Sequence, residues 1–167
     1  MKPQLFVFSG LPGTGKTTLA RLLAAHRRAA YVRIDTIEQA LRDVCGVSVT
    51  SEGYELAYRL AADNLRLGVD VVADSCNPIA LTRQQWHHVA AECAAHCVDI
   101  EICCSCETEH RRRVEARVVD IENLRPPAWS DVTSRHYEAW TTDRVMIDTA
   151  GVSPAVSLGQ LSAELDR

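Results

Sequence analysis

The sequence predicts an α/β fold in which helices cover both faces of a mostly parallel sheet. Two observations lead to this prediction. Short apolar runs typical of strands alternate with longer runs of helical period, and a glycine-rich loop follows the first apolar run directly. The chain has 167 residues, 47% of them hydrophobic and 24% charged. This length and composition are typical of a globular domain, so we expect residues 1–167 to form a single domain.

Five apolar runs fit buried strands, and the segments between them fit helices. The predicted strands are 4–9, 30–34, 69–73, 98–104 and 144–148. The predicted helices are 16–28, 36–45, 52–67, 80–95, 107–120, 131–140 and 154–165. Ligands of such open sheets bind at the carboxyl ends of the strands. The residues that follow each strand are therefore the first candidates for a functional site.

The loop after the first predicted strand reads GLPGTGKTT, at residues 10–18. Gly10, Gly15, Lys16 and Thr17 satisfy the pattern G-x-x-x-x-G-K-[ST], in which backbone N–H groups cradle phosphates. The lysine reaches the β- and γ-phosphates, and the threonine hydroxyl ligates Mg²⁺. An ordinary turn is the alternative, but the strand–loop–helix context favours a phosphate loop, or P-loop, that binds ATP and Mg²⁺. The expected binding residues are Gly10, Pro12, Gly13, Thr14, Gly15, Lys16, Thr17 and Thr18.

Three aspartates follow predicted strands. Asp74 has the place of a carboxylate linked to Mg²⁺, so Asp74 and Thr17 are the expected metal ligands. Asp35 suits a base that accepts a proton from a substrate hydroxyl. Each of these two side chains has a helix N-cap as its alternative role, and Glu38 gives Asp35 the spacing of a capping box. We interpret Asp148 as a turn residue.

A cluster of arginines lies in the stretch EHRRRVEAR, residues 109–117. Arg113 and Arg117 are four residues apart, so a continuous helix would place them on one face. Two guanidinium groups facing a phosphate loop would neutralise the charge of a transferring phosphoryl group. A solvated helix face with mixed ion pairs is the alternative. The phosphate loop favours the catalytic interpretation.

Together these stretches resemble a known family. The motifs GLPGTGKTTLARLLA, RIDT, VVADSCNPIALTRQQWHHVA and CETEHRRRVEAR are similar to those of small P-loop kinases of the polynucleotide 5′-kinase and zeta-toxin group, often described as AAA-type ATP-binding proteins. The resemblance covers roughly residues 4–140. It implies that Lys16 and Thr17 hold the phosphates and Mg²⁺. It also implies that Asp35 is the general base and that Arg113 and Arg117 are lid arginines.

The resemblance further implies a three-layer P-loop NTPase fold. Its sheet would have five parallel strands in the order 2-3-1-4-5, and a helical lid would occupy about residues 107–128. The chain departs from the polynucleotide kinase at two places where that enzyme has arginine, because Ile34 and Glu38 stand there. A nucleic-acid acceptor would lose two cationic contacts. The net charge of −4 also weighs against a broad grip on nucleic acid.

We therefore expect an ATP-dependent kinase whose acceptor is a hydroxyl of a small molecule. The alternatives are a polynucleotide 5′-hydroxyl kinase and a regulatory nucleotide-binding NTPase. Residues 45–66 are expected to contribute to the acceptor pocket through Tyr54, Tyr58 and Arg59, although a packing face is an equal alternative. Neither the acceptor, the preference for ATP over GTP nor the oligomeric state follows from the sequence.

The remaining expectations concern the surroundings of the protein. No apolar run approaches the length that spans a bilayer, and the first apolar run leads directly into the phosphate loop, so we expect a cytoplasmic protein and no membrane partner. The seven cysteines are expected to be free thiols. Cys103, Cys104 and Cys106 stand close together, but no second pair has zinc-finger spacing, so no structural zinc site is expected.

Overall fold

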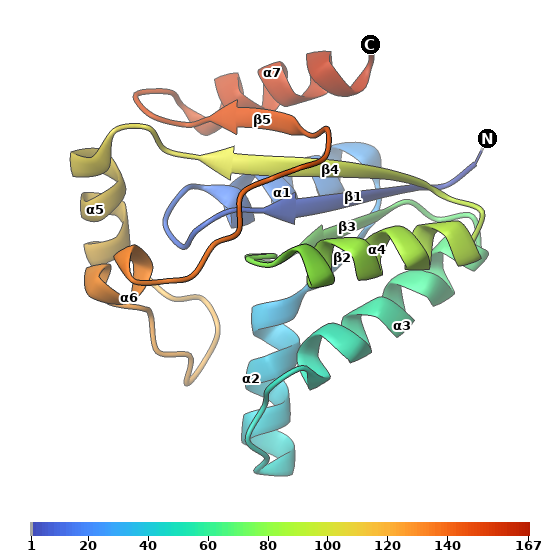
Figure 1. Ribbon diagram of the computed structural model, residues 1–167, viewed down its shortest axis with the longest axis horizontal. Coiled ribbons are helices and arrows are strands. Elements are labelled where there is room, and N and C mark those ends of the chain that lie inside the picture. The colour runs from blue at the N-terminus through green and yellow to red at the C-terminus, as the bar shows by residue number, and fades with distance from the viewer. Residues whose placement is uncertain (1) are drawn as a thin grey trace.

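The computed structural model describes residues 2–167 and contains a five-stranded, all-parallel sheet. The strand order is β2-β3-β1-β4-β5, as Figure 1 shows. The strands are β1 (Gln4–Ser9), β2 (Ala30–Arg33), β3 (Val71–Asp74), β4 (His96–Cys103) and β5 (Val145–Asp148). The predicted fold class and strand order are confirmed. The order places β1, which leads into the phosphate loop, at the centre of the sheet.

Helices cover both faces of this sheet. Those of the described part are α1 (Lys16–Arg27), α2 (Ile34–Cys45), α3 (Glu52–Arg66), α4 (Ala80–Glu92), α5 (Glu107–Glu115), α6 (Trp129–Thr133) and α7 (Pro154–Leu165). Leu5 and Val7 of β1 pack with α3 and α4 on one face, whereas Phe6 and Phe8 pack with α1 and α7 on the other. Both sides of β1 are therefore buried, as its continuous apolar run predicts.

Two predicted helices are shorter than expected. The helix predicted over 107–120 ends at Glu115, and the helix predicted over 131–140 is reduced to α6. In the second case tertiary contacts hold the chain extended, because the backbone N–H of Glu138 donates to the Pro78 carbonyl at 2.8 Å. Arg83 also donates to the Glu138 carbonyl and lies over the Trp140 ring. These partners are far away in sequence, so local periodicity could not reveal them.

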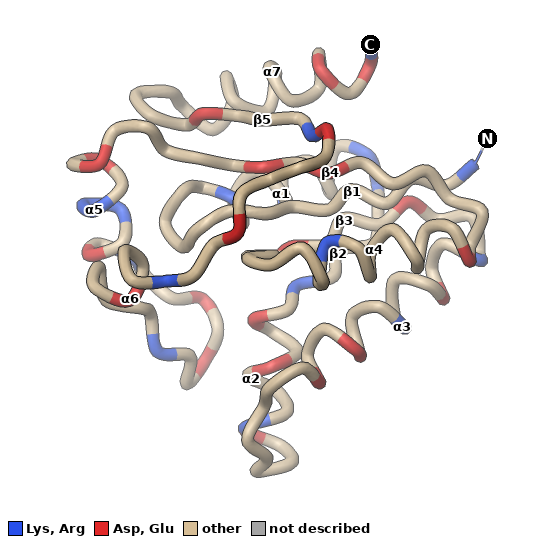
Figure 2. Tube along the Cα trace, in the orientation of Figure 1, with Lys and Arg blue, Asp and Glu red and all other residues tan. Residues whose placement is uncertain are grey.

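No helix within residues 2–167 combines the length and apolarity needed to cross a membrane. Charged residues are instead interspersed along the helices, and Figure 2 shows basic and acidic residues side by side on α2 and α5. These two helices lie near the carboxyl ends of the strands, where the phosphate loop also lies (Figure 1). Charged residues of these two helices thus lie near the edge of the sheet at which a ligand is expected.

Candidate active site

The phosphate loop joins β1 to α1 and is packed closely against its neighbours. Gly10 has a φ of 141°, and a Cβ placed there would lie 2.3 Å from the Ile102 carbonyl oxygen. Gly13 has a φ of 84°, and its Cβ would lie 2.4 Å from the Cγ2 atom of Val114. Only glycine fits these two backbone conformations without displacing β4 or α5. The loop therefore has the close-packed, glycine-dependent form that a phosphate cradle requires.

Two side chains that the sequence analysis did not single out fasten this loop. Thr149, directly after β5, donates its hydroxyl to the Thr14 carbonyl at 2.7 Å. His110 of α5 donates a ring N–H to the Pro12 carbonyl at 2.8 Å. Both partners are more than ninety residues away along the chain. The loop is thus positioned by β5 and α5 as well as by the elements that flank it.

Lys16 and Asp74 form a buried ion pair at the base of the loop. The Lys16 Nζ lies 3.0 Å from one oxygen of Asp74, and the Tyr31 hydroxyl donates to the other oxygen at 2.7 Å. Burial disfavours both charges, but their mutual attraction prevails. It raises the pKa of Lys16 above its ordinary value and, with hydrogen bonds from Tyr31, Lys16 and Thr17, lowers the pKa of Asp74.

The two expected metal ligands lie next to each other but differ in exposure. Thr17 lines the main cavity, whereas the Asp74 side chain is only 1% exposed and does not line it. The Thr17 hydroxyl is nevertheless one of the groups whose hydrogen bonds lower the pKa of Asp74. A hydroxyl at the cavity wall with a carboxylate behind it suits a Mg²⁺ site in which Thr17 is the direct ligand. Asp74 is engaged with Lys16 instead of facing the cavity.

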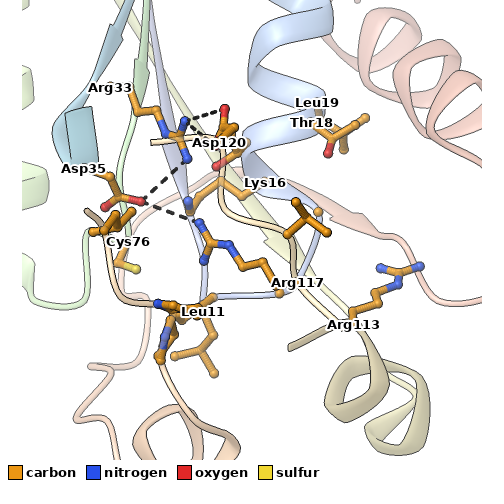
Figure 3. A pocket seen from close by; sticks show the side chains of 18 of the residues that line it. Leu11, Lys16, Thr18, Leu19, Arg33, Asp35, Cys76, Arg113, Arg117 and Asp120 are labelled. Carbon is orange, nitrogen blue, oxygen red and sulfur yellow. Dashed lines mark hydrogen bonds and ion pairs between the residues drawn. The ribbon is translucent and has the colours of Figure 1, made fainter. Parts of the chain in front are cut away.

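Asp35 lies in the first turn of α2 and faces the same cavity as Lys16. Figure 3 shows its carboxylate between two guanidinium groups. The Arg117 Nη2 lies 3.8 Å from the carboxylate, and the Arg33 Nη2 lies 4.0 Å from it. The side chain is 41% exposed, so a molecule in the cavity can reach it. Because Asp35 lies in the first turn of α2, its negative charge also interacts favourably with the dipole of that helix.

Arg113 and Arg117 both line the cavity, but a continuous helix does not align them. The expectation of a shared helical face was wrong, because α5 ends at Glu115 and Arg117 lies beyond it. Arg113 donates to the Thr149 hydroxyl and carbonyl at 2.7 and 2.8 Å. Arg117 points instead toward Asp35, as Figure 3 shows. The two arginines therefore approach the cavity from different directions.

A third arginine, Arg33, connects the two sides of the cavity. It ends β2, its side chain is 4% exposed, and it donates to both oxygens of Asp120 at 3.0 and 3.1 Å. Arg21 of α1 also pairs with Asp120. These arginines lower the pKa of Asp120 to about 2 against the opposing effect of burial. The segment after α5 is thus tied across the cavity to α1 and β2, which sequence reasoning did not anticipate.

The cavity has a volume of about 1220 Å³, above the usual range for a single small ligand. Nine basic and five acidic residues line it, although the whole chain has a net charge of −4. The basic residues are Lys16, Arg21, Arg33, Arg42, Arg112, Arg113, Arg117, Arg125 and Arg135; the acidic residues are Asp35, Glu38, Glu109, Asp120 and Asp131. The excess of positive charge suits a polyanionic ligand.

The expected contribution of residues 45–66 to this cavity was wrong. No residue of that range lines it. Tyr58 is buried and packs edge-on against Trp86 with ring centroids 4.6 Å apart, and the Tyr54 hydroxyl accepts from the Asn77 N–H at 3.2 Å. These side chains belong to the core between α3 and α4. The wall opposite the phosphate loop is formed by α2 instead, through Glu38 and its neighbours Gln39 and Arg42.

Residues 5–141 match the protein-family model described as an AAA domain. The chain belongs to this AAA domain family. The matched region contains the phosphate loop, Asp35, Arg113 and Arg117, but it ends before β5 and Thr149. Among proteins with curated descriptions, none matches the sequence of this AAA domain protein.

Several solved structures share the fold of this AAA domain protein. The Mycobacterium tuberculosis APS kinase CysC, in complex with AMPPNP and APS, is 16% identical, with 99% of each chain covered and a TM-score of 0.70. A gluconokinase from Sinorhizobium meliloti 1021 is 15% identical over 98% of this chain and 96% of its own, with a TM-score of 0.65. Chaetomium thermophilum Kti12, in complex with ADP-AlF3, is 23% identical over 96% of each chain, with a TM-score of 0.69. At these identities the likeness establishes the P-loop kinase fold.

Proposed function

We propose that this AAA domain protein is an ATP-dependent kinase that transfers the γ-phosphate of ATP to a hydroxyl of a small-molecule acceptor. The observation that carries the proposal is that Asp35 and the phosphate-loop residue Lys16 face one cavity of about 1220 Å³. That volume has room for a nucleotide and a second molecule. Structures of the same fold include one complex with both AMPPNP and APS, and a gluconokinase.

The loop is suited to hold the nucleotide. Its backbone N–H groups and Lys16 would bind the β- and γ-phosphates, and the α1 dipole would add positive potential at the same point. Thr17 would be the protein ligand of Mg²⁺, with Asp74 positioning its hydroxyl and Lys16 from behind. When bound, the ion neutralises charge on the β- and γ-phosphate oxygens. The excess of basic residues in the cavity favours this polyanionic substrate.

Asp35 would act on the acceptor. Its carboxylate accepts the proton of the acceptor hydroxyl as the oxygen of that hydroxyl forms a bond to the γ-phosphorus. The bond from the γ-phosphorus to the bridging oxygen breaks, and ADP leaves with the electron pair. Arg117 is close enough to Asp35 to orient it, and Arg113 lies beside the loop near Gly15. Both guanidinium groups would stabilise the charge that spreads over the transferring phosphoryl group.

A polynucleotide 5′-hydroxyl kinase is the second candidate, and one observation favours it. Arg42 and Arg135 line the cavity with Asp35 and would offer cationic groups to an acceptor that carries a phosphate. They would offset the arginines that Ile34 and Glu38 replace. Binding to a short oligonucleotide at two salt concentrations separates the candidates, because each phosphate contact makes affinity fall with salt. A small neutral acceptor shows little such dependence.

The decisive experiment measures ATP consumption and acceptor phosphorylation over a panel of hydroxyl compounds and 5′-hydroxyl oligonucleotides. With the accepted substrate, Asp35→Asn should retain ATP binding, because the amide is nearly isosteric and lies outside the phosphate loop. It should lose transfer by a factor of about a hundred or more, since removal of a general base has that effect. Asp63→Asn, an exposed aspartate of α3, is the matched control and should transfer normally.

Two outcomes would contradict the proposal. Full transfer by Asp35→Asn would remove the assignment of the base and leave a structural role at the start of α2. The regulatory NTPase would be favoured if no compound of the panel accelerated ATP hydrolysis and the γ-phosphoryl group were recovered only as inorganic phosphate.

A further inference from the structure

A cluster of three side chains of metal-ligating type lies at the other end of the sheet from the phosphate loop. His87 of α4 and Cys97 and Asp99 of β4 bring one ligand atom each within 4.8 Å of one another. Within residues 2–167 this is the one group of three or more such side chains gathered at that spacing. Cys97 pairs in register with Leu5, near the start of β1, whereas the phosphate loop follows the end of that strand. The cluster is thus separate from the active site.

The strand geometry explains why two of the ligands face the same way. Cys97 and Asp99 are two residues apart on β4, so both side chains project toward the face covered by α4. Figure 1 shows α4 alongside the sheet on this side. Cys97 packs at the margin of the apolar cluster that contains Trp86 and Val89 of α4. Asp99 is buried on the same face of β4, and a carboxylate that is buried beside apolar side chains needs a partner that compensates its charge.

Within the described residues, only one of the two carboxylate oxygens of Asp99 has a hydrogen-bond partner. Its Oδ2 lies 2.7 Å from the His87 Nε2, but its buried Oδ1 has no hydrogen-bond partner within residues 2–167. The Asp99 side chain is only 2% exposed. Glu101, the next acidic residue on the same face of β4, differs because Tyr137 and Arg144 occupy its two oxygens. An unpartnered, buried carboxylate oxygen in this cluster points to a missing cation.

We propose that His87, Cys97 and Asp99 bind a zinc ion. Imidazole nitrogen, thiolate sulfur and carboxylate oxygen are the three ligand types that Zn²⁺ takes from proteins. A Cys97 thiolate and the Asp99 carboxylate together balance the two charges of the ion, which suits a partly buried site. When the ion binds, the Cys97 thiol releases its proton to solvent. The hydrogen on His87 Nε2 moves to Nδ1 of a neutral ring, or to solvent from a protonated one, so a neutral imidazole coordinates the ion in the place that this hydrogen held beside Asp99.

A zinc ion can reach this cluster from solvent and be coordinated there. The His87 side chain is 49% exposed, so an ion can enter from solvent and a water molecule can complete a tetrahedral set on that side. Donor atoms within 4.8 Å of one another need to move only slightly to surround an ion at about 2.0–2.3 Å from each ligand. The ion would connect α4 to β4, and its role would be structural, at a distance from phosphoryl transfer.

The test is a titration of the purified, metal-free full chain with Zn²⁺ by calorimetry, with competition by a chromophoric chelator. Wild type should bind one ion at this site. His87→Ala, Cys97→Ala and Asp99→Asn should each weaken binding by at least about tenfold, the lower limit for loss of even an outer-shell partner. His88→Ala, which removes the neighbouring imidazole on α4, and Cys45→Ala, which removes an exposed thiol, are the matched controls and should bind as wild type does.

Two further measurements separate a specific site from scattered thiol binding and from misfolding. Co²⁺ in place of Zn²⁺ should give a thiolate-to-metal charge-transfer band that Cys97→Ala loses and Cys45→Ala keeps. Zn²⁺ should raise the unfolding temperature of wild type and His88→Ala but not of His87→Ala, because only a ligand bound to the native state stabilises it. His87 is half-exposed, so its variant should fold even where Asp99→Asn does not. Equal zinc affinity of wild type, His87→Ala and Cys97→Ala would overturn the proposal.

Discussion

At the scale of single residues, Lys16 serves two partners. In this structure its ammonium group is paired with the buried carboxylate of Asp74, 3.0 Å away. The proposed reaction requires the same group to contact the β- and γ-phosphates. The Lys16 ammonium group keeps its charge both with and without bound nucleotide, because the carboxylate and the phosphates are both anionic. Its substitution should therefore affect stability as well as catalysis.

We predict that Lys16→Met abolishes phosphoryl transfer and lowers the free energy of unfolding by roughly 3 kcal/mol near neutral pH, the scale for breaking a buried ion pair. The pKa of Asp74 is lowered in the folded protein. The stabilisation is therefore present above the ordinary aspartate pKa and is lost as the pH falls below it. The stability gap between wild type and variant should shrink on acidification, as measured by urea unfolding at several pH values.

A variant with the second partner also removed provides the control. In Lys16→Met with Asp74→Asn, no uncompensated charge remains, so part of the lost stability should return. Transfer activity should stay absent in both variants. A stability gap that is the same at about pH 7 and about pH 3 would show that the pair does not account for the loss.

At the scale of elements, α5 is a short helix whose position depends on contacts with the loop. His110 donates to the Pro12 carbonyl, and the Cγ2 atom of Val114 lies only 2.4 Å from the position that a Cβ at Gly13 would take. Arg113, between them, is directed at Thr149. A helix held in this way places Arg113 beside the phosphate loop, near Gly15.

We predict that Arg113→Ala and Arg117→Ala lower turnover by one to three powers of ten and change ATP affinity much less, because their charges act mainly on the transition state. Arg→Lys should recover little, since lysine lacks the planar fork of two donors. Steady-state kinetics and nucleotide-binding measurements give the two quantities.

Arg111→Ala is the matched control, because Arg111 lies on the same helix but pairs with Glu115 and does not line the cavity. Its turnover should equal that of wild type. If Arg113→Ala and Arg117→Ala behaved in the same way as this control, the two arginines would have no part in catalysis.

At the scale of the whole molecule, Asp120 joins parts of the chain that lie on opposite sides of the cavity. Arg33 from β2 and Arg21 from α1 meet it in the segment after α5. Because these partners lower the pKa of Asp120 to about 2, the stabilising contribution exists above the ordinary aspartate pKa of 3.8. It disappears as the pH falls from about 4 to about 2.

We predict that Asp120→Asn frees the segment 116–128 at neutral pH, since the amide cannot replace the two ion pairs. Limited proteolysis should cut this segment faster in the variant, and mass spectrometry locates the cuts. Asp166→Asn, which removes an exposed ion pair with Arg27 at the end of α7, is the control and should leave those cuts unchanged. Equal cleavage of 116–128 in all three proteins would show that Asp120 does not restrain it.

The phosphate loop and the strands could be predicted because their signals are local. The motif from Gly10 to Thr17 consists of residues close together in the sequence. The strand β1 is recognisable by its continuous apolar run. Asp35 could be selected because residues that follow parallel strands share one edge of the sheet. The strand order came from the resemblance to P-loop kinases, and the structure confirms it. The functional roles of the site residues stay predictions.

By itself, the sequence determined the fold class, the phosphate loop and the edge of the sheet at which it lies, because helical period, strand period and glycine spacing are properties of neighbouring residues. Only the tertiary structure decided which side chains surround the loop. Arg33 and Asp120 meet across 87 residues, His110 and Pro12 across 98, and His87 joins Cys97 and Asp99 from a different element. Such pairs depend on how the helices pack on the sheet, and no local pattern of residues encodes that packing.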